Sequence, residues 1–106
     1  MSRESLGHFE LLVLLALMRQ SDEAYGVPIA RAIEESTGKR VILASVYNTL
    51  ERLEEKGFVR SAVGQPTAER GGRAKRYFAI TTAGLRQVRA AKKALTILWR
   101  GIPVEG

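Results

Sequence analysis

Cysteine is absent from this 106-residue chain, and histidine occurs only once, as His8. Without cysteine, neither a disulfide framework nor a cysteine-based zinc site can form. A single imidazole leaves no Ser/His/acid or Cys/His grouping for nucleophilic catalysis, and no glycine-rich phosphate-binding pattern is present. The sequence therefore predicts a protein that is not an enzyme and that uses no metal or other cofactor.

Long hydrophobic runs are also lacking. The longest extends from Leu11 to Met18 and is bounded by Glu10 and Arg19. A bilayer span needs about 20 residues, and a signal peptide carries positive charge before its apolar run, where this chain has Glu10. The run is typical of a buried helix, and we expect no membrane partner. With the absence of cysteine, it fits a cytoplasmic protein.

Acidic residues are scarce in the C-terminal half. Residues 60–106 hold ten Lys/Arg and two Asp/Glu, a net charge of +8, whereas residues 1–59 hold seven and nine, a net charge of −2. A one-sided basic field points to an acidic polymer or an anionic surface. A basic domain that is merely well solvated remains an alternative, so charge alone does not decide the function.

Hydrophobic periodicity and glycine punctuation predict a mainly α fold with a small β-hairpin. Residues 39–42 are expected to form a short strand before the third helix, and residues 64–74 the turn of the hairpin. The expected helices cover residues 6–20, 25–37, 44–56 and 83–100, and the expected strands cover 58–63 and 76–80. This order predicts a winged helix-turn-helix domain over residues 1–81, followed by a C-terminal dimerisation helix and tail over residues 82–106.

The helix expected over residues 44–56 has a buried seam of Val46, Leu50 and Leu53 at i, i+4 and i+7. In a helix-turn-helix, the N-terminal part of this second helix enters the major groove, where Asn can pair with adenine and Arg with guanine. The opposite face supplies such side chains: Ser45, Asn48, Thr49 and Arg52. An ordinary solvated helix face is the alternative interpretation. Beside it, Tyr47 can pack on the domain while its hydroxyl reaches a phosphate, or can be purely structural.

The predicted hairpin tip concentrates positive charge around the pair Gly71-Gly72. Its basic residues are Arg70, Arg73, Lys75 and Arg76, with Glu69 the one acid among residues 69–76. A basic loop of this kind can follow the DNA backbone or enter a narrow minor groove, which favours Arg. A solubilising loop is the alternative, but it leaves the clustering unexplained. Lys39 and Arg40, just before the third helix, can contact flanking phosphates or be plain surface charges.

Four blocks of the sequence together resemble the PadR family of bacterial transcriptional regulators. They are ELLVLLAL (10–17), AYGVPI (24–29), SVYNTLERLEEKG (45–57) and GGRAKRYFAITTAG (71–84). The resemblance extends from about Leu6 to Leu98 and matches the short form of the family, with one C-terminal helix. It implies a homodimer whose C-terminal helix packs against the partner, and repression through a palindromic operator. It maps Tyr25-Gly26 to the start of the second helix, Tyr47 to the recognition helix and residues 70–76 to the wing. Tyr25 is accordingly expected among the DNA-binding residues.

Some members of that family sense phenolic acids or planar drugs near the dimer interface. The resemblance therefore suggests a small aromatic effector, with Trp99 in the C-terminal helix as a residue that lines its site. Packing of Trp99 against a second subunit is the alternative. Two features of the chain itself also predict a homodimer: the first helix is apolar on several faces, and the last helix has an apolar seam with little in this chain to cover it.

The leading hypothesis is thus a homodimeric repressor that binds double-stranded DNA. The recognition helix (44–56) would lie in the major groove and the basic wing (64–76) on the backbone or in the minor groove. The alternative is a winged-helix protein-interaction module that does not read DNA, with the last helix as its main surface.

Overall fold

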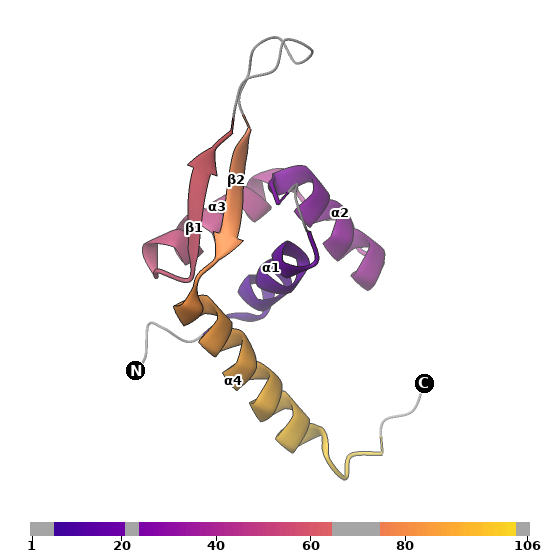
Figure 1. The fold of residues 1–106 in the computed structure, drawn as a ribbon. Helices are drawn as coiled ribbons and strands as arrows, with labels where there is room; N and C mark the ends of the chain where they lie inside the picture. Colours follow the sequence, from indigo (N-terminus) through magenta and orange to yellow (C-terminus); the bar gives the residue numbers. More distant parts are fainter. Residues whose placement is uncertain (1–5, 21–23, 65–74, 104–106) are drawn as a thin grey trace.

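The computed structural model describes residues 6–20, 24–64 and 75–103, which form a mainly helical fold with one antiparallel hairpin (Figure 1). The elements follow the order α1 (His8–Met18), α2 (Gly26–Thr37), α3 (Leu43–Glu55), β1 (Val59–Val63), β2 (Arg76–Ile80) and α4 (Thr82–Trp99). This is the winged helix-turn-helix arrangement expected from the sequence. Among the described residues, no helix combines the length and apolar character that crossing a membrane would require.

The core lies where α1 meets α2, α3 and the hairpin. α1 contributes Val13, Leu14, Ala16 and Leu17, all buried, because its sequence is apolar almost all round. The same property leaves apolar side chains on its outer side, where Leu15 and Met18 are exposed. One helix therefore serves both the core and an uncovered apolar surface.

α2 and α3 pack on α1 through the seams that their periodicity predicts. Val46, Leu50 and Leu53 of α3 are fully buried against Ile29 and Ile33 of α2 and the rest of the core. α2 ends where Gly38 adopts a left-handed backbone conformation, with φ of 72°, which a residue with a side chain would disfavour. The chain can then turn sharply toward α3.

The short strand expected over residues 39–42 is not present. This segment has an irregular conformation because no neighbouring strand is available to pair with it, and Ile42 instead serves as the N-cap of α3. The Val41 backbone N–H donates to Glu34 Oε2 at 2.8 Å, which replaces a ladder hydrogen bond. The helix that follows spans residues 43–55, one position earlier than expected.

β1 and β2 pair in register, with Val59 opposite Ile80 and Ser61 opposite Phe78. Phe58, Val59 and Phe78 bury their side chains against the helices. The hairpin is also tied to the α1–α2 connection, because the Phe78 backbone N–H donates to the Ala24 carbonyl at 2.8 Å. The expected turn over residues 64–74 lies outside the described residues except for Gly64.

α4 is anchored at its first turns and then leaves the rest of the fold (Figure 1). Thr81 caps it: its hydroxyl accepts from the Gly84 backbone N–H at 3.1 Å and lies 2.7 Å from the Gly57 carbonyl, to which it donates. Gly84 approaches the Phe58 carbonyl so closely that a side chain would not fit. Of the described α4 residues, only Gly84 and Val88 are buried.

Candidate nucleic-acid interface

The exposed face of α3 carries three of the four predicted base-reading residues. Ser45, Asn48 and Arg52 are exposed, as the helical spacing predicted. Thr49 is not: it is only 2% exposed, and its hydroxyl accepts a hydrogen bond from Arg52 Nη2 at 3.3 Å. The placement of Thr49 on the outer face was therefore wrong, because position 49 falls three residues after Val46 and turns inward beside the seam. From there Thr49 can support Arg52 but cannot reach a ligand on the outer face.

Tyr47 fixes the start of α3 against the start of α2. Its ring lies directly on Gly26, so closely that a side chain at Gly26 would overlap the ring. Tyr47 is half-buried as a result. The contact favours the packing role for the ring, and it holds the N-terminal half of α3 at one angle to α2.

The C-terminal half of α3 is held to α1 by a buried carboxylate. Lys56 Nζ lies 3.0 and 2.9 Å from the two carboxylate oxygens of Glu10, and Arg52 Nε lies 3.7 Å from Glu10 Oε2. Burial raises the pKa of Glu10, but the hydrogen bond from the Gly7 backbone N–H and the contact with Lys56 more than offset this. The pKa of Glu10 therefore lies below its usual value.

The base of the wing carries two of the predicted basic residues, and both contact neighbouring groups. Lys75 Nζ stands 3.9 Å above the ring of Tyr25, and that ring meets Tyr77 edge-on at 5.8 Å between centroids. Cation–π contacts of this kind place a positive charge without neutralising it. Tyr25, which precedes α2, thus joins the wing base to the helix-turn-helix.

Arg76 is bound to the recognition helix. Its Nη2 lies 2.6 Å from Glu54 Oε1, its Nε donates to Ser61 Oγ at 3.1 Å, and Nη1 lies 3.9 Å from Glu51 Oε2. The geometry fixes the first residue of β2 on the side of α3. Part of the positive charge that the sequence assigned to the wing is therefore neutralised within the molecule.

Of the remaining basic residues predicted to bind DNA, two are described in the structure and two are not. Lys39 and Arg40 are exposed just before α3, and neither enters an ion pair within the described ranges. Arg70 and Arg73 lie outside the described residues.

The sequence analysis did not identify Glu10 as a site residue, although one signal was available. Glu10 is the acidic residue at the start of the longest apolar run, where a charge needs a partner.

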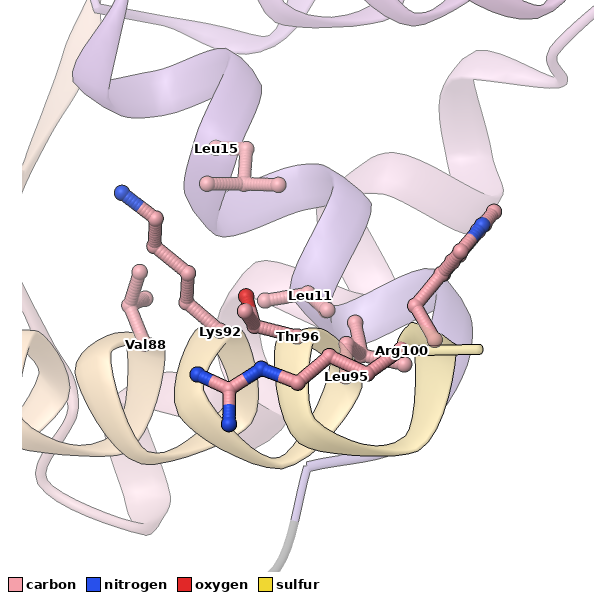
Figure 2. A pocket seen from close by; sticks show the side chains of 8 residues that line it. Leu11, Leu15, Val88, Lys92, Leu95, Thr96 and Arg100 are labelled. Atoms are coloured by element: carbon pink, nitrogen blue, oxygen red, sulfur yellow. The ribbon is translucent and has the colours of Figure 1, made fainter. Parts of the chain in front are cut away.

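A groove of about 580 Å³ runs between α1 and α4 (Figure 2). Leu11 and Leu15 of α1 line one side. The other lining residues come from α4 and its C-cap: Val88, Lys92, Leu95, Thr96, Trp99 and Arg100. Trp99 is 57% exposed. An apolar groove of this size can take another helix or a planar ligand. No three described His, Asp or Glu side chains cluster as metal ligands would.

The model of the transcriptional regulator PadR-like family matches residues 14–90. Solved structures agree. A PadR-like transcription factor from Bacteroides fragilis has a TM-score of 0.72 at 20% identity, over 85% of this chain and 82% of that chain. A PadR family transcription regulator from Clostridium difficile R20291 has a TM-score of 0.70 at 20% identity, over 87% and 91%. The complex structure of hsRosR-S1 has a TM-score of 0.67 at 26% identity, over 90% and 78%. No curated protein sequence matches the chain significantly.

Proposed function

The chain belongs to the PadR-like family of transcriptional regulators, and from this we propose that it is a homodimeric repressor that binds a palindromic operator. Regulators of this family bind DNA and are not enzymes. In a symmetric dimer, two copies of α3 enter successive major grooves, about one helical turn apart. The two-fold axis of the protein then coincides with that of the operator.

The observation that carries this proposal is the exposed polar face of α3, set between the wing base and the segment that precedes the helix. Asn48 and Arg52 have the donors and acceptors to pair with adenine and guanine edges, and Ser45 can pair with either. Thr49 is left out of direct reading because it is buried. Tyr47 holds the helix in place and offers its hydroxyl to a phosphate.

Phosphate neutralisation supplies the sequence-independent part of the affinity. We assign it to the exposed Lys39 and Arg40, to Lys75 beside Tyr25, and to Arg70 and Arg73 of the wing tip. Arg76 contributes less than the sequence suggested, because Glu54 and Glu51 already partner its guanidinium. The wing therefore acts chiefly through residues beyond its base.

Dimerisation is supported by the apolar side chains that one chain leaves uncovered. Leu95, Ile97, Leu98 and Trp99 of α4 are all exposed, as are Leu15 and Met18 of α1. Seating α4 of a second copy in the groove between α1 and α4 would cover Leu15, Leu95 and Trp99, which line that groove. On this basis residues 82–106 form the dimerisation unit and residues 1–81 the DNA-binding unit.

The same groove supports a small aromatic effector as a second occupant. It is lined by apolar side chains, with Trp99 available to stack on a planar ring and Lys92 and Arg100 available for an anionic group. Tryptophan fluorescence tests this part of the proposal, because Trp99 is the one tryptophan of the chain. Emission that does not respond to any aromatic acid or planar cation tried would contradict it.

Selection of bound sequences from a random duplex pool, followed by polarization titrations at several salt concentrations, tests the proposed function. We expect a palindromic site and salt-dependent affinity. Arg73→Ala should weaken binding to all duplexes and lower the salt slope by about one unit, whereas Asn48→Ala should relax preference at one position in each half-site. No salt-dependent duplex binding would instead favour a winged-helix module that binds another protein.

A further inference from the structure

We propose that Glu10 of α1, together with Thr49 of α3, positions the Arg52 guanidinium and so sets the base preference at the operator position that Arg52 contacts. This inference rests on the proposed DNA-binding function. Both residues act through Arg52 and do not contact DNA themselves, because Glu10 is almost entirely covered and Thr49 is buried.

The Arg52 guanidinium has two edges that can donate hydrogen bonds. Nε faces Glu10 Oε2 at 3.7 Å, and Nη2 donates to Thr49 Oγ1 at 3.3 Å. These two nitrogens form the lateral edge of the planar group, which carries five N–H donors in a fixed arrangement. The terminal edge, with Nη1 and the second hydrogen of Nη2, remains available, and the Arg52 side chain is 55% exposed. Two parallel N–H donors on that edge match the acceptors O6 and N7 of guanine.

Holding one edge of a long side chain makes the other edge more selective. An unrestrained Arg loses rotamer freedom when an interface immobilises it. An Arg already held by Glu10 and Thr49 loses less, and it presents one orientation to the base rather than many. Discrimination between guanine and another base then depends on the restraint as well as on the guanidinium itself.

Glu10 is itself fixed, which a positioning residue requires. Its carboxylate accepts from the Gly7 backbone N–H at 2.8 Å and from Lys56 Nζ at 2.9 and 3.0 Å, and its side chain is 9% exposed. A purely structural interpretation is that Glu10 only balances the charge of Lys56. The two interpretations predict different outcomes, because charge balance affects stability and positioning affects base choice.

The effect of the charge change on DNA affinity further separates the positioning interpretation of Glu10 from the structural one. Replacing a carboxylate by an amide adds one positive charge, which by itself strengthens binding to any duplex. If Glu10 positions Arg52, Glu10→Gln should weaken binding to the selected operator relative to other duplexes, against this general trend. Glu55→Gln on the exposed side of α3 changes the net charge equally without touching Arg52, so it is the matched control.

The experiment titrates the wild type, four single variants, one double variant and the Glu55→Gln control against the selected operator and against operators with single base substitutions. We expect Glu10→Gln and Thr49→Val each to lose about 5- to 20-fold of the discrimination at the Arg52 position, within the range that one bidentate contact supplies. Arg52→Ala should abolish that discrimination, and adding Glu10→Gln to it should change nothing more. Thr49→Ser, which keeps the hydroxyl, should retain it.

Several results would overturn the inference. Unchanged base discrimination in folded Glu10→Gln, or equal losses at every operator position, would leave Glu10 a structural residue. If Glu10→Gln fails to fold, Thr49→Val decides the question: full discrimination by that variant contradicts the positioning role. A wild-type protein that selects no operator refutes the proposed function instead, so the two failures are distinguishable.

Discussion

The body of the molecule and the C-terminal half of α4 differ in what covers their apolar side chains. Among the described residues, the body formed by α1–α3 and the hairpin encloses all of the buried apolar side chains except Val88. Beyond Val88, α4 exposes most of Leu98 and Trp99, 71% and 57%. Apolar groups buried within the chain stabilise its fold, whereas a contiguous exposed set marks a binding surface. The body therefore determines folding, and the end of α4 is available for association.

Replacing one leucine in each region tests this comparison most strongly. Leu50→Ala empties a fully buried position and should lower the free energy of unfolding by about 2–5 kcal/mol. Leu98→Ala should change it by no more than about 0.5 kcal/mol when the protein is dilute enough to be monomeric, yet should raise the dissociation constant of the proposed dimer. Denaturant unfolding and sedimentation at a series of concentrations measure both. Equal unfolding costs for the two variants would contradict the division.

The junction between the two regions is a close contact at Gly84. A side chain there would overlap the Phe58 carbonyl, so Gly84→Ala should force α4 away from the hairpin and cost about 1–3 kcal/mol. Gly7→Ala is the control, since its added carbon would lie 3.7 Å from Glu10 Oε1, an ordinary contact. Thermal unfolding compares the two. A Gly84→Ala protein as stable as Gly7→Ala would show that the start of α4 is not a fixed anchor.

Within the body, Glu10 provides a pH-dependent contribution. Its folded-state pKa lies below the usual value of 4.5, so its stabilisation is present above pH 4.5 and is lost as the pH falls through the folded-state pKa. We expect Glu10→Gln to cost about 1–3 kcal/mol at neutral pH, and the difference from wild type to shrink as the pH decreases below 4.5. Denaturant unfolding at several pH values measures this. Glu35→Gln, an exposed change of the same kind on α2, is the control.

The local features of this fold could be predicted from the sequence, because each depends on residues close together in the chain. The seam of Val46, Leu50 and Leu53, the helix end at Gly38 and the cap at Thr81 all follow from spacing and backbone preference. The antiparallel pairing of β1 and β2 also joins two runs that are neighbours in the sequence. The family resemblance rests on these same local blocks.

The contacts that shape the site could not be predicted in this way. Glu10 and Lys56 are 46 positions apart, and Arg76 and Glu54 are 22 apart, so no periodicity relates them. Thr49 lies at the edge of the buried seam, where one step of helical rotation decides between solvent and core. The assignment of Arg70 and Arg73 to DNA contacts, outside the described residues, stays a prediction.

The smallest expected effect on stability concerns the contact between the wing base and the body of the molecule. Lys75 stands above Tyr25 and should contribute about 0.5–1 kcal/mol through that contact. Lys75→Gln should therefore cost more than Arg60→Gln, a matched loss of charge on the exposed side of β1 with no ring beneath it in the described structure. A double-mutant cycle with Tyr25→Leu isolates the pair, because the cost of Lys75→Gln should disappear once the ring is gone. An unchanged cost in the Tyr25→Leu background would mean that Lys75 is a solvated charge and that its contact with the ring does not help to hold the wing to the body.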